Sequence, residues 1–379
     1  MKKVVSIMLC LVMLLPLSGC GSSQETTAVT GQTSAQTNEQ ADAKTPDSKT
    51  PDSKTSDSKI LDFKTSDSKS SESKNSHFTM AISWTDEPEA YTIQLMGLAA
   101  KETGEDYITL DMIRSYDLKY DENGKLVDAV DEHGILTPEA ARVVKENTWL
   151  NSNVEEVMED VDCIIIPGGR DVSPTLCYHE QAWHGIEEET DYCAERDVSD
   201  YLLIDYCLEH DIPILAICRG MQMLSIVSGA EIIQDIPTWL SEQGIQYTDI
   251  HRDPEKKDLI PHTASVLSKD SLLYKVTGKT TLDGVPSWHH QLVSDVTGTR
   301  LTVAAETDTD GIPTIEAVER RDRTFCLGLQ FHPEVAVGKH VNNEANAGEF
   351  LDYDTAMSFF RSLVEAGKEY EQEELQPAA

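Results

Sequence analysis

From about residue 78 to the end of the chain, short continuous apolar runs alternate with segments in which apolar residues recur at helical spacing. The runs expected to form strands are 78–84, 161–166, 212–217, 301–306, 314–319 and 325–330. The segments expected to form helices are 90–101, 194–209, 219–228 and 356–370. Strands that alternate with helices predict an α/β fold, a doubly wound and mostly parallel sheet with helices on both faces. Ligands of such folds bind at the carboxyl ends of the strands.

The pattern before residue 78 is different. Two lysines, then the twelve-residue apolar stretch 4–15, then Leu-Ser-Gly-Cys ending at Cys20 are typical of a secretory signal of the bacterial lipoprotein kind. The stretch is too short to span a bilayer as a mature helix. We therefore expect residues 1–19 to be a signal peptide and Cys20 to be the lipidated N-terminus, held at the outer face of the cytoplasmic membrane. The alternative is an ordinary secretory signal with an incidental cysteine.

Residues 20–77 are rich in Ser, Thr, Asp and Lys, and they carry a five-residue repeat, Thr-Pro-Asp-Ser-Lys at 45–49 and again at 50–54. So few apolar side chains cannot offset the entropy of ordering the chain, which predicts a disordered tether. The expected organisation is therefore a signal at 1–19, a tether at 20–77 and one folded domain at 78–379.

The net charge limits the partners. The formal net charge of −36 lies almost wholly in residues 78–379, because the tether carries nearly as many lysines as acids. A polyanion repels nucleic acid and anionic membrane surfaces. We therefore expect no nucleic-acid partner and a membrane contact only through the lipid. The sequence leaves a homo-oligomer open.

One segment has the pattern of a nucleophile elbow. The apolar run 212–217 leads directly into Cys218, Gly220 follows two residues later, and a helix is expected to start at Arg219. A strand-turn-helix of this kind lifts a nucleophile above the sheet, and the helix N-terminus offers N–H groups to an oxyanion. A buried structural cysteine on a core strand is the alternative.

Two further segments supply partners for such a thiol. The strand expected at 325–330 is followed by His332 and Glu334, a base and an orienting acceptor two residues apart, with the strand expected to run to His332. Gly168 and Gly169 follow the apolar run 161–166, where glycines let the backbone approach a substrate closely.

Taken together, these segments resemble the class I glutamine amidotransferase-like superfamily, and within it the γ-glutamyl-γ-aminobutyrate hydrolase branch. The resemblance covers roughly residues 80–365. Its blocks are Pro-Gly-Gly-Arg-Asp-Val-Ser-Pro at 167–174, Glu-Arg-Asp at 195–197, Ile-Cys-Arg-Gly-Met-Gln at 217–222, Ser-Trp-His-His-Gln at 287–291, Ile-Glu-Ala at 315–317 and Gly-Leu-Gln-Phe-His-Pro-Glu at 328–334.

The resemblance implies a role for specific residues. It implies a catalytic triad of Cys218, His332 and Glu334, and oxyanion N–H groups at Gly169 and Arg219. It implies that the γ-glutamyl group is bound by the residues Gly168, Gln222, Ser287, Trp288 and His289. No cofactor and no metal are expected for this reaction.

The chain departs from the family pattern around the pocket. Ala216 stands where a glycine is usual, Ser225 and Gly229-Ala230 replace an Asn and a Gly-Gly pair, and Pro286 stands where an Asn is usual. The triad positions are intact, so the departures bear on the substrate. The function expected is a cysteine hydrolase that cleaves a γ-glutamyl amide through a thioester and releases glutamate. The alternatives are a surface lipoprotein that binds γ-glutamyl compounds without turnover, a cell-wall peptide hydrolase, and an ammonia-delivering amidotransferase subunit, which export disfavours.

Other candidates carry less weight. His289 and His290 could bind a metal, but adjacent residues of a strand point to opposite faces. We expect His251 and His262 at the surface or the pocket rim, and the acidic runs 187–189 and 371–374 to be solvated. Arg170, Arg219 and Arg252 could each pair with a substrate α-carboxylate. Among the cysteines, a Cys177–Cys193 bridge is conceivable, whereas Cys163, Cys207 and Cys326 fit buried free thiols.

Overall fold

The structure is a computed structural model that describes residues 77–255 and 259–375. The expected signal peptide, Cys20 and nearly all of the tether lie outside these residues. The strands are β1 Met80–Ile82, β2 Tyr107–Thr109, β3 Cys163–Ile166, β4 Ile214–Ile217, β5 Glu231–Ile233, β6 Ile260–Val266, β7 Thr281–Ser287, β8 Leu292–Asp295, β9 Leu301–Thr309, β10 Ile312–Arg320 and β11 Cys326–Leu329. The α-helices are α1 Tyr91–Lys101, α2 Pro138–Asn147, α3 Val154–Val157, α4 Ala194–Glu209, α5 Arg219–Val227, α6 Ile236–Glu242, α7 Leu272–Thr277, α8 Pro333–Val341 and α9 Tyr353–Glu374.

Nine of these strands form one sheet in the order β2-β1-β3-β4-β11-β10-β9-β6-β7. The half from β2 to β11 is parallel. From β10 onward each strand runs antiparallel to its neighbour. The parallel half contains the adjacent strands β3, β4 and β11. The segments that carry Gly168, Cys218 and His332 follow these three strands.

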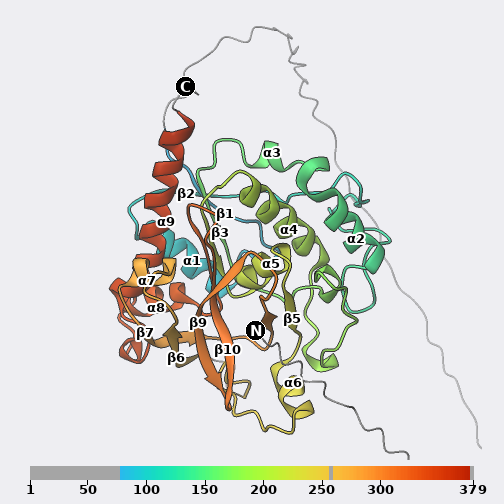
Figure 1. The fold of residues 1–379 in the computed structure, drawn as a ribbon. Helices are drawn as coiled ribbons and strands as arrows, with labels where there is room; N and C mark the ends of the chain where they lie inside the picture. Colours follow the sequence, from blue (N-terminus) through green and yellow to red (C-terminus); the bar gives the residue numbers. More distant parts are fainter. Residues whose placement is uncertain (1–76, 256–258, 376–379) are drawn as a thin grey trace, which may run out of the picture. The chain divides into compact units, whose positions relative to one another are not determined.

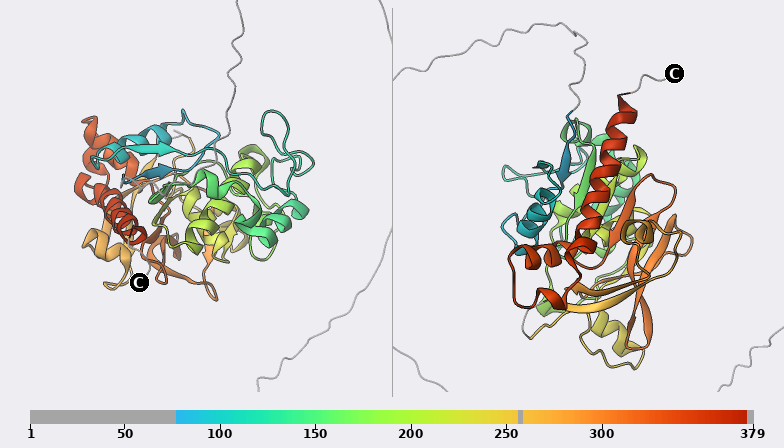
Figure 2. Two further views of the ribbon diagram at one scale, coloured as in Figure 1. Left: turned by 90° about the horizontal axis from the view of Figure 1, so that it is seen from above. Right: turned by 90° about the vertical axis from the view of Figure 1, so that its left-hand side faces the viewer.

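Helices cover both faces of the sheet, as the alternation of strands and helices predicts. In Figure 1, α2 to α5 lie on one side and α1 and α7 to α9 on the other. Figure 2 shows the long helix α9 lying along the face of the sheet that it covers. The central strands are buried on both sides, and successive residues enter different cores. Ile164 and Ile166 pack with α4 and α5, while Cys163 and Ile165 pack with α9.

The helix ends follow ordinary capping chemistry. Thr137 caps α2 by accepting a hydrogen bond from the Ala140 N–H, and Asp352 caps α9 by accepting one from Thr355. A side-chain oxygen at this position satisfies an N–H that lacks an intrahelical partner. These caps fix where the two helices begin. Packing of the helices on both faces of the sheet holds the carboxyl ends of the parallel strands at one edge.

Candidate active site

Cys218 lies at the sharp turn between β4 and α5. Its backbone has φ 51° and ψ −109°, a conformation that non-glycine residues seldom adopt. Its N–H donates to the carbonyl oxygen of Leu329, at 2.6 Å. Gly220 is required just beyond, because a Cβ there would lie 2.2 Å from the carbonyl oxygen of Ile166. The close approach of α5 to β3 therefore depends on this glycine, and the turn has the geometry expected of a nucleophile elbow.

His332 and Glu334 are joined by a short hydrogen bond. The expectation that a strand runs to His332 is wrong, because β11 ends at Leu329 and the chain leaves the sheet before the histidine. His332 instead precedes α8, and Glu334 lies in the first turn of that helix. His332 Nδ1 lies 2.6 Å from Glu334 Oε1, and both side chains are buried. His332 and Glu334, two residues apart in the sequence, therefore lie at the start of a helix rather than at the end of a strand.

The ring of His332 also contacts Cys218. Burial disfavours the charged ring, but the Glu334 carboxylate, the charge of a Cys218 thiolate and the hydrogen bonds to both residues together raise the pKa of His332 well above its usual value. Nδ1 is engaged by Glu334, so Nε2 is the nitrogen left for the thiol. The arrangement places a base beside the thiol and an acceptor behind the base.

The two glycines after β3 lie against this pair. A Cβ on Gly168 would be 2.9 Å from His332 Cε1 and 3.4 Å from Cys218 Cβ. Gly169 has φ 148°, and a Cβ there would meet the guanidinium of Arg196. Arg219 is the first residue of α5, where N–H groups lack intrahelical acceptors. The N–H of Gly169 thus lies in the loop after β3, and that of Arg219 lies where the β4–α5 loop meets the helix.

A buried ion-pair network fixes these two loops. Arg196 Nη2 donates to the carbonyl oxygens of Pro167 and Gly168, at 3.0 and 2.7 Å. Arg219 pairs with Asp200 and with Asp197 Oδ1, the latter at 2.6 Å, and all these side chains are buried. The Arg219 side chain is therefore unavailable for the substrate α-carboxylate that the sequence suggested.

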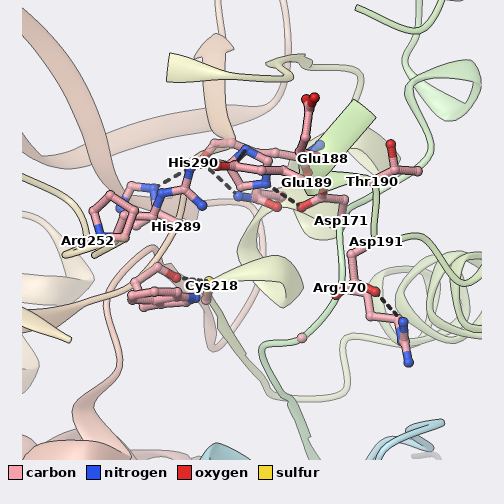
Figure 3. Close-up of a pocket in the computed structure, with 15 residues that line it drawn as sticks. Arg170, Asp171, Glu188, Glu189, Thr190, Asp191, Cys218, Arg252, His289 and His290 are labelled. Atoms are coloured by element: carbon pink, nitrogen blue, oxygen red, sulfur yellow. Dashed lines mark hydrogen bonds and ion pairs between the residues drawn. The ribbon is translucent and has the colours of Figure 1, made fainter. Parts of the chain in front are cut away.

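A pocket of about 540 Å³ opens beside Cys218. Its wall is formed by the residues 169–171, 188–191, 252, 254 and 288–291, together with Cys218 and Gln222. Figure 3 shows Cys218 on one side of the pocket and the charged side chains gathered across from it. These charged side chains are Arg170, Asp171, Glu188, Glu189, Asp191, Arg252 and His290. The pocket is thus mostly polar and wide enough for a small substrate.

The structure brings together most of the residues expected to bind substrate. Gln222, Trp288 and His289 line the pocket, and the Trp288 carbonyl oxygen accepts from the Cys218 thiol at 3.8 Å. Ser287 does not line it, because its buried hydroxyl donates to the carbonyl oxygen of His251, at 2.8 Å. Gly168 packs against Cys218 and His332 and is not among the residues that line the pocket.

The sequence missed a network that lines the far wall. His290 lies between Asp171 and Asp235, at 3.0 and 3.2 Å, and Glu189 lies 2.5 Å from Arg252. Burial opposes protonation, yet hydrogen bonds from His290 to the two aspartates raise the pKa of its ring to about 9. In the run 187–189, Glu187 and Glu188 are exposed, as expected, and Glu189 is half-buried. Glu188 and Glu189 also line the pocket, which the sequence did not indicate.

Other expectations are corrected by burial. His251 is completely buried and the His262 side chain is 9% exposed, so neither lies at the surface. Gln330 was given no role, but its amide donates to Cys218 Sγ at 3.6 Å. Cys177 and Cys193 are free thiols, so the conceivable bridge is not formed. Within residues 77–255 and 259–375, no helix combines the length and the apolar character needed to cross a membrane.

Comparison with known proteins identifies the family. The family model of Peptidase C26 matches residues 139–334. Protein NtpR of Enterococcus hirae is 32% identical over 194 residues, which cover 51% of this chain and 74% of that protein. The γ-glutamyl-γ-aminobutyrate hydrolase PuuD of Escherichia coli is 32% identical over 187 residues, 48% of this chain and 68% of that protein. The solved glutaminase domain of Trypanosoma brucei CTPS aligns over 77% of this chain and 94% of its own, with 16% identity and a TM-score of 0.43. The chain therefore belongs to the Peptidase C26 family, within the class I glutamine amidotransferase-like superfamily, and is a hydrolase of the cysteine peptidase type.

Proposed function

We propose that the protein hydrolyses γ-glutamyl amides through a thioester on Cys218 and releases glutamate. The observation that carries the proposal is the buried His332–Glu334 hydrogen bond of 2.6 Å, with the histidine ring against Cys218 at the base of a polar pocket. The name of the PuuD relative supports a γ-glutamyl substrate.

The reaction follows from this arrangement in two halves. The Cys218 thiolate attacks the γ-carbonyl carbon, and the resulting oxyanion accepts hydrogen bonds from the N–H groups of Gly169 and Arg219. The C–N bond breaks as His332 gives its proton to the leaving amine. Water, deprotonated by His332, then cleaves the thioester and frees glutamate. Glu334 orients His332 and stabilises its charged form.

The pocket wall constrains the leaving amine only weakly. It holds four carboxylates, and three of these pair with its cationic side chains: Asp171 with His290, Glu189 with Arg252 and Asp191 with Arg170. The fourth, Glu188, leaves the wall with a small excess of negative charge. An amine that carries a further positive charge would therefore be weakly attracted to this wall, and an amine that carries a carboxylate would be weakly repelled.

The site would work outside the cytoplasmic membrane. This part of the proposal rests on the N-terminal sequence, with Cys20 as the lipid-bearing residue and residues 20–77 as the tether. Mass spectrometry of the mature N-terminus, purified from the native host, tests it. An unmodified or absent Cys20 would refute the lipid anchor.

The catalytic test is release of free glutamate from a panel of γ-glutamyl amides whose leaving amines are cationic, neutral or anionic. Wild-type protein is expected to release glutamate and Cys218→Ala to release none, because the nucleophile is gone while the fold is kept. Cys163→Ala is the matched control, since that buried cysteine lies on β3 with its side chain on the face of α9. Equal turnover by Cys218→Ala would refute the scheme. Tight binding without turnover by the wild type would instead support a γ-glutamyl-binding lipoprotein.

A further inference from the structure

Three imidazoles converge on one carboxylate behind the pocket wall. Glu316 lies on β10 and is completely buried. Around it stand His251 from the loop before β6, His262 on β6 and His289 just after β7. Glu316 Oε1 lies 3.5 Å from His251 Nδ1 and 4.0 Å from His289 Nε2, while Oε2 lies 3.7 Å from His262 Nε2.

Hydrogen bonding does not account for this cluster. The separations are too long for hydrogen bonds. Within the described part of the chain, neither oxygen of Glu316 has a hydrogen-bond partner, and the same holds for His251 Nδ1 and His289 Nε2. Buried polar atoms without partners are costly and call for an explanation such as a bound ion.

A bound metal ion would account for these atoms. An imidazole nitrogen that carries no proton presents a lone pair, and a carboxylate oxygen presents another, so each of the unpartnered atoms can ligate a metal.

The separations match ligands that share one ion. Two ligands about 2.0–2.2 Å from a tetrahedral zinc lie roughly 3.3–3.6 Å from each other. His251, His289 and Glu316 each offer one ligand atom, and these three atoms lie within 4.8 Å of one another. The 3.5 Å between His251 Nδ1 and Glu316 Oε1 fits this range, and the His289 ring must move closer to Glu316 to complete the site.

In His251 and His289, the ring nitrogen that faces away from Glu316 already has a polar partner. His289 Nδ1 lies 3.0 Å from the carbonyl oxygen of Gln291, so it must carry the proton and Nε2 faces Glu316 as a lone pair. His251 Nε2 lies 2.7 Å from the hydroxyl of Thr309, which also hydrogen-bonds Thr314. Support of the non-ligating nitrogen by a backbone carbonyl or another polar group is typical of metal-binding histidines.

His290, the next residue in the chain after His289, has a different environment. His290 lies in the pocket wall next to His289 (Figure 3), and its ring lies among Glu189, Asp171 and Asp235. Both of its nitrogens contact carboxylates, and Asp235 also accepts from the Thr238 N–H at 2.8 Å. That cluster is a satisfied ion-pair network, so the two adjacent histidines serve different purposes.

We propose that His251, His289 and Glu316 bind one divalent transition-metal ion, with zinc the best match to two imidazoles and a carboxylate. His262 is the nearest candidate for a fourth ligand. The ion would join β10 to the loops that carry His251 and His289, and so stiffen the pocket wall that contains Trp288.

The first test measures metal in the full chain, purified without chelators and without a polyhistidine tag. Inductively coupled plasma mass spectrometry is expected to find about one zinc per chain in the wild type. Cys218→Ala is expected to keep this ion, and Glu316→Gln, which preserves shape but removes the charge, is expected to lose it. Thr309→Val is expected to weaken zinc binding about tenfold or more, as loss of a supporting group does.

His290→Gln is the matched control for an adjacent histidine and is expected to keep the ion. Loss of the ion in Cys218→Ala would place it at the catalytic thiol, and loss in His290→Gln alone would place it in the other cluster. Either result overturns the proposal, as does a wild-type chain that retains no zinc after incubation with zinc and gel filtration.

A second measurement uses only the wild-type protein, so its outcome does not depend on whether a variant folds. X-ray absorption at the zinc edge of the wild-type protein is expected to show only nitrogen and oxygen ligands at about 2.0–2.2 Å, with the scattering of imidazole rings. A sulfur ligand at about 2.3 Å would show that the ion sits at Cys218 and would refute the site.

Discussion

The packing of Gly168 against the catalytic pair makes Gly168→Ala an informative single substitution. The new methyl would lie 2.9 Å from His332 Cε1 and 3.4 Å from Cys218 Cβ. Carbon atoms in contact prefer about 3.5–4.0 Å. The ring cannot rotate away freely, because its Nδ1 is held 2.6 Å from Glu334. The histidine must therefore move by roughly 0.5–1 Å relative to the thiol.

The size of the effect follows from that displacement. A misplacement of about 1 Å costs on the order of 100-fold in rate, or about 2.7 kcal/mol of transition-state stabilisation. We expect kcat to fall about 10- to 100-fold. Overpacking is expected to lower the free energy of unfolding by about 1–3 kcal/mol, which leaves most of the chain folded.

Two assays check this expectation. The first is glutamate release from the best γ-glutamyl amide, and the second is the rate at which iodoacetamide alkylates Cys218, which needs no substrate. The alkylation rate at pH 6 is expected to fall, because a displaced His332 is less well placed to take the proton of the thiol. Gly348→Ala is the control, since a Cβ there meets nothing within 4 Å. Wild-type turnover and alkylation in Gly168→Ala would refute the reasoning.

The remaining predictions concern the supports of the site. Arg196→Lys is expected to lower the free energy of unfolding by about 3 kcal/mol, because an ammonium cannot replace the buried fork that holds two backbone carbonyls; an unchanged urea midpoint would contradict this. Glu334→Gln tests the raised pKa of His332. A histidine whose pKa is raised by folding adds stability that is complete below about pH 6.5 and is lost as the pH rises through the folded-state pKa. The stability difference between wild type and Glu334→Gln is therefore expected to be largest below pH 6.5 and to shrink at higher pH in urea titrations, and a difference that grows with pH would count against the assignment. Cys177 and Cys193 are expected to be alkylated in denaturant without reductant, and a peptide-mapped disulfide between them would disprove the free-thiol state.

The sequence predicts four of the five strands in the parallel half of the sheet, because β1, β3, β4 and β11 are buried and read as continuous apolar runs. It misses β2, a three-residue strand whose residues are exposed or half-buried. The runs at 161–166 and 212–217 contain β3 and β4, and the helix expected at 194–209 matches α4. The antiparallel strands β6 and β7 were missed. β6 alternates exposed and buried residues and includes Pro261, so it lacks the signal of a buried run.

The site could be predicted only where local geometry carries the chemistry. An elbow cysteine, and a histidine and glutamate two residues apart, are local patterns, so Cys218, His332 and Glu334 could be named from the sequence. The cluster around Glu316 could not, because His251, His262 and His289 are brought to it by the pairing of β6 with β7 and of β6 with β9. Histidines separated this widely give no spacing signal, and their burial depends on strand pairing that the sequence did not reveal.

Arg219, which follows Cys218, has a structural role in addition to the one proposed for its N–H in the reaction. Its N–H is the one that the mechanism uses, but its side chain points the other way, into the pairs with Asp197 and Asp200 on α4. Asp200 also lies 3.5 Å from Arg196 Nε, and Arg196 in turn holds the carbonyl of Gly168. One buried chain of charges therefore links the loop after β3 to the start of α5, whose N–H groups would stabilise the proposed oxyanion. Because unpairing a buried charge is far more costly than losing a surface pair, these two segments cannot move apart independently. The network would thus preorganise the proposed oxyanion site before substrate arrives, which is where electrostatic catalysis gains most.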